Sequence, residues 1–341
     1  MMLDNRTPWP AQFILAFDRK GHEQAVTVVK ATFVLPTEPG APCLPAEEPL
    51  PLTEADVFGP DPATDAPVFE TDFAARKPFC DVLCHGRAHA PGGRPVTELG
   101  VGIRLGQWSK RFMVHGARIW LRRPTGFRPS DKRPFTSQPI GYDVAFGGID
   151  RAPADPERVE YHPENPCGTG FYPLQSDLEG KPLALTAEWG DEAATPTGPC
   201  RPMAFGPVGR AWLPRRQFAG TYDDRWTAER MPFLPDDFDD RYFQSAALDQ
   251  QVTAPRGGEP VELVNLSPRG RIATHLPHLQ VVAGYERRSG RITPRIADLD
   301  TVLFLPEQDR VTLTYRARLT AERDLFEFTR IAITAAEASH G

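Results

Sequence analysis

Proline recurs along the whole of this chain at about twice the ~5% share usual for proteins, with 37 among 341 residues. Because proline has no backbone N–H and fixes φ, this density breaks long helices. The sequence therefore predicts short elements joined by stiff loops. A chain of this length suits two ordinary domains or one large composite unit.

Composition and charge narrow the class of protein. Hydrophobic residues make up 40% and charged residues 25%, values typical of globular chains. The net charge of −6 has both signs interspersed and no basic stripe, so nucleic-acid binding has no electrostatic basis. Residues 1–6 lack the features of a secretion signal, and no apolar run approaches the ~18 residues of a membrane span. The five cysteines, an odd number, predict reduced thiols in a cytoplasmic protein.

Runs of β-branched and aromatic residues dominate both ends of the chain. Residues 12–17 and 25–34, joined by the turn-forming residues 18–23, predict an N-terminal hairpin. Residues 36–67 are rich in Pro, Glu and Asp and predict a long surface loop. Further strands are predicted, first as an antiparallel meander and then near the C-terminus, at 81–88, 97–105, 110–116, 117–121, 261–266, 279–285, 301–305, 310–317 and 328–334.

The part between these ends has little strand periodicity. Short helices are predicted to start at Asp223 and at Asp237 or Asp239, whose side chains can cap the N–H groups that follow. The predicted fold is mainly β, with antiparallel sheets from the N- and C-terminal parts forming a sandwich-like scaffold.

We expect residues 1–341 to form one interlocked unit. Its parts are a β-rich stretch at 1–122, an irregular Pro/Gly-rich and aromatic stretch at 123–255, and a second β-rich stretch at 256–341. Because the middle stretch is poor in periodic apolar residues, we expect it to drape over the sheets without a core of its own.

Cys80, Cys84 and His85 form the most obvious candidate metal cluster. If residues 80–84 form one strand, the two cysteines stand roughly 13 Å apart on one face, at about 3.3 Å per residue. Zinc ligands must converge to ~2.3 Å from the ion, so this pair cannot chelate one zinc together. We interpret both as buried thiols that pack as small apolar groups, and we expect no metal or cofactor.

The acidic run at 236–240 lacks the central Gly and distal Glu of a calcium loop. Asp223 paired with Asp237 or Asp239 is one alternative, a carboxylate-dependent hydrolase, although helix capping explains these residues more simply. Nucleophile-elbow and phosphate-loop motifs are missing. We therefore do not predict an enzyme.

Glycines beside aromatic residues recur through the middle stretch. Gly lets two backbones approach while a ring packs across them, and Trp, Tyr and Arg on rigid loops are the residues that interface hot spots use. The alternative is that these residues only fix a loop region onto the sheets and bind no partner. The candidate protein-interaction residues are Asn165, Phe171, Tyr222, Asp223, Trp226, Asp237, Phe238, Asp239, Arg241 and Tyr242.

A series of short strings runs in order along the chain at 30–33, 77–82 with Gly86 and 90–91, 114–120, 145–148, 165–171, 220–223 with Trp226, 234–243 and 249–251. Taken together, these strings resemble the bacterial domain-of-unknown-function family 2169, which is linked to type VI secretion. Cys80 and Ala117 stand where the family pattern leads us to expect Thr and Asp.

The resemblance implies a non-catalytic adaptor or chaperone with no cofactor. Its expected partner is a secreted effector with a PAAR or PAAR-like spike-tip domain, with the spike protein as a second expected partner. Nucleic acid and membrane are not expected partners. Besides the hydrolase, the remaining alternative is a structural component that stays in the assembled secretion apparatus.

Overall fold

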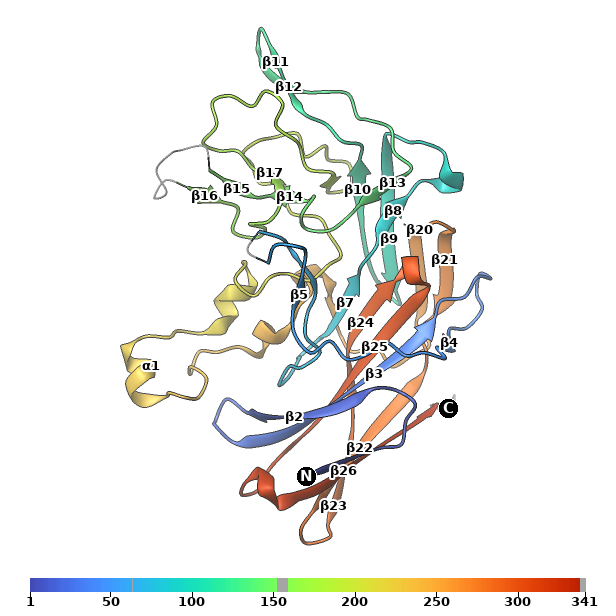
Figure 1. Ribbon diagram of the computed structural model, residues 1–341, viewed down its shortest axis with the longest axis vertical. Helices are drawn as coiled ribbons and strands as arrows, with labels where there is room; N and C mark the ends of the chain where they lie inside the picture. Colours follow the sequence, from blue (N-terminus) through green and yellow to red (C-terminus); the bar gives the residue numbers. More distant parts are fainter. Residues whose placement is uncertain (63, 152–158, 338–341) are drawn as a thin grey trace.

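The structure is a computed structural model that describes residues 1–62, 64–151 and 159–337. These residues are mainly β, arranged in three larger sheets and several two-stranded ribbons, with a few short helices (Figure 1). The predicted fold class is therefore confirmed. Within the described ranges, no helix is long and apolar enough to cross a membrane.

The largest sheet combines strands from both ends of the chain. The hairpin of β2 and β3 is present as predicted, and β3 pairs along its whole length with β25. All neighbours are antiparallel except β7 and β24, which run parallel. The strand order is β19 (Gln251–Val252), β7 (Cys80–Cys84), β24 (Asp298–Leu305), β25 (Arg310–Thr320), β3 (Glu23–Val34) and β2 (Ala11–Phe17), with β4 (Leu44–Pro45) also on β3.

Two further sheets complete the scaffold. The five-stranded sheet runs in the order β18 (Thr186–Ala187), β10 (Trp108–His115), β9 (Glu98–Leu105), β20 (Pro260–Ser267) and β21 (Gly270–His275). The four-stranded sheet runs in the order β1 (Met2–Asn5), β26 (Phe328–Glu337), β22 (Leu279–Arg287) and β23 (Ile292–Ile296).

The smaller elements decorate these sheets. The ribbons are β5 (Val57–Phe58) with β6 (Pro67–Phe69), β8 (Arg87–His89) with β13 (Ser137–Pro139), β11 (Trp120–Arg123) with β12 (Gly126–Pro129), β14 (Phe146–Gly147) with β17 (Thr169–Gly170), and β15 (Ile149–Asp150) with β16 (Glu160–Tyr161). The helices are α1 (Asp224–Glu229) and the 3-10 turns η1 (Pro91–Gly93), η3 (Arg215–Ala219), η4 (Asp240–Phe243), η5 (Leu248–Gln250), η6 (Pro306–Gln308) and η7 (Leu325–Glu327).

The two predicted helix starts are confirmed. The Asp223 side chain caps α1 by accepting a hydrogen bond from the Trp226 N–H, and Asp239 caps η4 by accepting one from the Arg241 N–H. A carboxylate is favourable at both places, because the first N–H groups of a helix have no backbone partner.

The main core lies on one face of the seven-stranded sheet. Side chains alternate along a strand, so Val311, Leu313 and Tyr315 of β25 point into this core together with residues of the other two sheets. The Thr27 hydroxyl of β3 reaches the Tyr285 hydroxyl of β22 at 3.0 Å across it. The alternate residues of β25 face the opposite side of the sheet.

Two sequence expectations about the organisation need correction. β9 and β10 pair as predicted, but β7 does not join their meander; it pairs with β24 in the seven-stranded sheet. The middle stretch also has small cores of its own, which aromatic residues form without any periodic pattern. They include Tyr142 with Trp212, Phe146 with Ala184, and Trp120 with Leu183.

We predict that Leu313→Ala lowers the free energy of unfolding by about 2–5 kcal/mol, because it leaves a cavity in the main core. Leu313 is fully buried. The matched control is Leu15→Ala on β2, where the side chain is 57% exposed and a change within about 0.5 kcal/mol is expected. Urea unfolding measures both, and equal losses would contradict the assignment of faces.

Candidate functional site

The face of the seven-stranded sheet opposite the core is polar. Along β25 this face carries Thr312, Thr314, Arg316, Arg318 and Thr320, in strict alternation with the core residues. Loop segments 53–77 and 244–245 cover most of it, so charged groups there are buried against the loops. Buried charges need partners of opposite sign, and this requirement organises the region.

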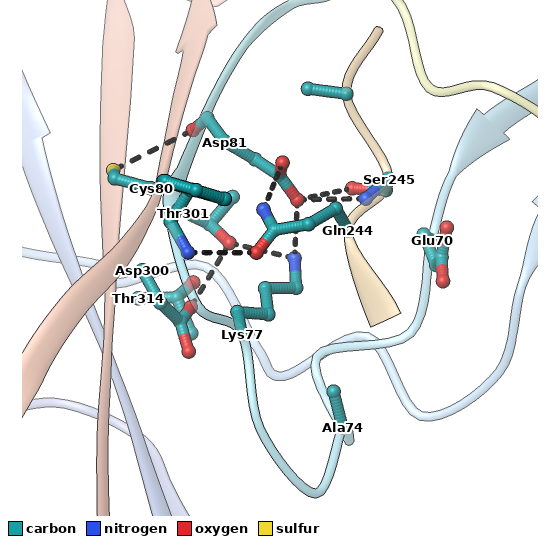
Figure 2. A network of polar contacts seen from close by, with 12 residues as sticks. Glu70, Ala74, Lys77, Cys80, Asp81, Gln244, Ser245, Asp300, Thr301 and Thr314 are labelled. Atoms are coloured by element: carbon teal, nitrogen blue, oxygen red, sulfur yellow. Dashed lines mark hydrogen bonds and ion pairs between the residues drawn. The ribbon is translucent and has the colours of Figure 1, made fainter. Parts of the chain in front are cut away.

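Lys77 and Asp81 form the centre of this buried polar face (Figure 2). Their side chains pair at 2.8 Å and are 6% and 0% exposed. Asp81 also accepts bonds from the Gln244 side chain at 2.6 Å and from the Ser245 N–H at 2.8 Å, and Lys77 donates to the Thr301 hydroxyl at 3.0 Å. The carboxylate therefore fixes residues 244–245 onto β7.

A second pair lies beside the first. The Arg316 guanidinium bonds the Asp300 carboxylate at 2.5 Å and the Ala74 and Asp72 carbonyls at 2.8 and 2.9 Å. Lys30 of β3 pairs with the Asp72 carboxylate at 2.9 Å. These contacts fix the segment around residue 72 onto β3 and β25.

The electrostatics of Lys77 indicate a structural role. Burial by itself lowers its pKa, but the nearby carboxylates, Asp81 foremost, more than reverse this effect and raise it. A lysine that acts as a nucleophile or base needs a lowered pKa. The adjoining cavity is about 30 Å³, which holds little more than water.

Arg215 joins the middle stretch to the same region. Its guanidinium pairs with Glu70, and it donates to the Val208 carbonyl at 2.8 Å and the Tyr242 carbonyl at 2.9 Å. The ends of the loop that carries α1 are therefore held by buried charge-assisted bonds, which are the stronger kind of hydrogen bond.

The loop itself presents aromatic residues. Tyr222 and Trp226 stack edge to face with ring centroids 4.8 Å apart, and the Trp226 indole donates to the Phe233 carbonyl at 2.9 Å. Tyr222 remains 54% exposed and Met231 62% exposed. Figure 1 shows this loop with α1 projecting from the side of the molecule near β2, and the Phe17 ring of β2 packs against Phe233 at 5.5 Å.

The C-terminal half of this loop is braced by polar contacts. Asp237 accepts bonds from the Thr221 N–H and hydroxyl at 2.9 and 2.7 Å. Asp239 pairs with Arg241, whose guanidinium lies 4.2 Å from the Phe218 ring. Among the predicted interaction residues here, Asp237 and Arg241 are exposed, Asp239 and Tyr242 are half-buried, and Phe238 is buried.

Asn165 and Phe171 lie elsewhere in the middle stretch. Asn165 is fully buried and donates to the Tyr142 and Phe146 carbonyls at 2.8 and 3.1 Å. Gly147 packs against it with φ of 150°, and a Cβ there would lie 2.2 Å from the Asn165 carbonyl oxygen. Phe171 is half-buried against Phe146. Both side chains organise the interior of the loops, and any effect of Asn165 on a partner is indirect.

The three carboxylates of the hydrolase alternative already have hydrogen-bond partners within the loop. Asp223 caps α1; the bonds from Thr221 lower the pKa of Asp237, and the bond from Arg241 lowers the pKa of Asp239. A general acid in a glycosidase-like pair needs a raised pKa. The geometry therefore does not favour this alternative.

Cys80 and Cys84 are buried thiols in β7, as the sequence predicts. Burial raises the pKa of both, which disfavours the thiolate form that binds zinc. No group of three or more His, Cys, Asp or Glu side chains is placed to hold a metal ion in the described part of the chain.

Sequence reasoning missed the polar face and its residues Lys30, Asp72, Lys77, Asp81 and Arg316. The signal in the sequence was the alternation of polar and apolar residues along the strand at 310–320. A strand with an apolar set and a polar set usually has one face in water. Here the loops cover the polar set.

A family model described as "Uncharacterized protein conserved in bacteria" (DUF2169) matches residues 20–316. This range contains the seven-stranded sheet from β3 to most of β25, the whole middle stretch and the buried polar face as far as Arg316. Neither the comparison with curated proteins nor that with solved structures found a match.

We predict that Asp81→Asn costs about 3–5 kcal/mol of unfolding free energy, because it leaves the Lys77 charge buried without its counter-charge. The double variant Lys77→Met/Asp81→Asn is expected to lose less than the sum of the two single losses. Urea unfolding of all three variants forms a double-mutant cycle. The control Arg225→Met removes a fully exposed pair with Glu229 and should leave the urea midpoint unchanged; additive losses at 77 and 81 would contradict the coupling.

Proposed function

Because the chain belongs to the DUF2169 family of uncharacterized bacterial proteins, we propose that it is a non-catalytic adaptor of type VI secretion. In this proposal it works in the cytoplasm and binds a secreted effector through a PAAR or PAAR-like region. It then helps load that effector onto the spike, with the spike protein as a second partner.

The observation that carries the proposal is the braced aromatic loop at 220–243. Tyr222 and Met231 are exposed although the loop around them is held by the α1 cap, the Asp237–Thr221 bonds and the Arg215 contacts. Exposed aromatic residues whose positions are fixed lose little entropy when a partner covers them. This is the arrangement expected of an interface anchor.

β2 extends the same surface. It ends the strand order of the seven-stranded sheet, so its outer edge has backbone groups available for pairing. Leu15 and Phe17 on β2 are 57% and 49% exposed, and Phe17 contacts Phe233 of the loop. A partner segment can therefore add to the sheet edge and contact the loop together, which suits β-strand addition.

The proposed mechanism is burial of an apolar or strand-edge surface of the effector until handover. The scaffold supplies stiffness through its buried charge pairs, and the loop and β2 supply the contact area. No step in this mechanism makes or breaks a covalent bond, so the proposed role is that of a binding protein rather than an enzyme.

The first experiment is co-purification of the chain with the PAAR-containing product of a neighbouring gene. We expect a complex that co-elutes on size-exclusion chromatography. Failure of every PAAR-containing candidate to co-elute would contradict the adaptor. Measuring the amount of this protein in secreted fractions separates an adaptor from a structural component, because an adaptor stays in the cell and a spike component is exported.

We predict that Tyr222→Ala weakens effector binding by about 2 kcal/mol, or roughly thirtyfold in Kd, because it removes an exposed anchor ring. Tyr161→Ala is the matched control: this ring is 47% exposed on β16, away from α1 in Figure 1, and its loss should leave Kd unchanged. Calorimetric titration measures both. Equal Kd values for Tyr222→Ala and wild type would show that the effector binds elsewhere.

A further inference from the structure

A cleft of about 390 Å³ lies where the β2–β3 turn meets the end of the aromatic loop. Its floor comes from β3 and β25, one wall from the turn at 17–22, and the other from residues of the 234–243 segment. Arg76 and the neighbouring Ala75 close its remaining side.

Positive groups outnumber negative ones in this cleft. Four lining residues, Arg19, Lys20, Arg76 and Arg318, are cationic, whereas Asp18 and Asp240 are the acids. Asp240 is already shared by Arg76 at 3.0 Å and Arg19 at 4.0 Å. Asp18 accepts from the His22 ring at 2.9 Å.

Arg318 has no ion-pair partner among the described residues. On the polar face of the sheet, Lys30 has Asp72 and Arg316 has Asp300, each within 2.9 Å. Arg318 is the next residue of this row, and its side chain makes no hydrogen bond or ion pair with any residue that the structure describes, although the carboxylates of Asp298 and Asp240 act on it from farther away.

The surroundings of Arg318 make the absence of an ion pair energetically unfavourable. It is half-buried, and burial together with the positive charge of Arg76 lowers its pKa by more than the carboxylates of Asp298 and Asp240 raise it. A partly desolvated guanidinium with no carboxylate in direct contact destabilises the structure, and an anion bound to it reduces that cost. The planar guanidinium fork of Arg318 also matches the two-oxygen geometry of a carboxylate.

We propose that this cleft binds an acidic side chain, Asp or Glu, of an extended partner peptide. The partner is a peptide because the cleft adjoins the end of the edge strand β2 at Phe17, and apolar Leu234 and Phe243 also line it beside the charges. An extended peptide on that edge places alternate side chains on the same face, so one acid enters the cleft while apolar neighbours cover its rim.

This inference rests on the proposed adaptor function and names the chemistry of its partner: an acidic, otherwise apolar strand. Because the cleft and the aromatic loop share the segment 234–243, one partner segment reaches both. Loss of Arg318 should weaken the interaction and reduce its dependence on salt.

The test needs no effector. The probe is a fluorescent peptide of three Asp-Leu repeats, with an Asn-Leu repeat peptide as its uncharged counterpart, measured by fluorescence anisotropy. We expect wild type to bind the acidic peptide at least tenfold more tightly than the neutral one, and Arg318→Gln to lose about tenfold in affinity. Arg123→Gln on β11, an exposed arginine at the opposite end of the molecule in Figure 1, is the matched control and should bind as wild type does.

The thermal midpoint keeps the experiment decisive. Because Arg318 has no described partner to lose, the unliganded Arg318→Gln variant should melt no lower than wild type, so weaker binding reports the site. Equal affinity for the acidic and neutral peptides, or equal loss in Arg123→Gln, would overturn the proposal. Displacement of the peptide by millimolar inorganic phosphate but not by glutarate would also overturn it, in favour of a phosphate site.

The outcomes separate this inference from the adaptor proposal. Peptide binding that depends on Arg318, with no effector co-eluting, would leave the site standing and contradict the adaptor. An effector complex that is unchanged in Arg318→Gln would leave the adaptor standing and contradict the site.

Discussion

The seven-stranded sheet must bury both of its faces, and one of them is charged. That constraint decides where the loops of this protein lie. Asp72 pairs with Lys30 of β3, Asp81 of β7 pairs with Lys77, and Glu70 pairs with Arg215 of η3, so each ion pair fixes a loop segment in place. An ion pair in such a place gives little net stability against an apolar alternative, but losing one partner is costly. The pairs therefore fix position more than they add stability.

Fixed loops explain why the middle of the chain is stiff without regular structure. The proline-rich segments have few N–H groups for a ladder, so side chains supply the bonds: Asn165 to three carbonyls, Arg215 to two carbonyls and a carboxylate, and Asp237 to Thr221. Gly147 allows the close approach of two such segments. A surface built in this way holds Tyr222 in one place, as the proposed adaptor role requires.

The sequence revealed the local features and missed the distant ones. Period-2 patterns found the β2–β3 hairpin and the β9–β10 pair, and the capping preference of Asp found the starts of α1 and η4. The contacts of Asp81 with Ser245 and of Arg316 with Asp72 join residues far apart in the chain, and no local pattern encodes them. The small cores around Trp212 and Phe146 were also not predicted, because isolated aromatic rings leave no periodic signal in the sequence.

The pairing of β3 with β25 has a consequence for biosynthesis. Strand 23–34 leaves the ribosome long before its neighbour in the centre of the sheet, residues 310–320, is made. At about 5–20 residues per second, the wait is tens of seconds, during which β3 exposes an apolar face and an unpaired edge. β7 waits similarly for β24. The nascent chain is thus open to aggregation throughout that interval, and a truncation before residue 310 removes the middle of the largest sheet rather than its margin.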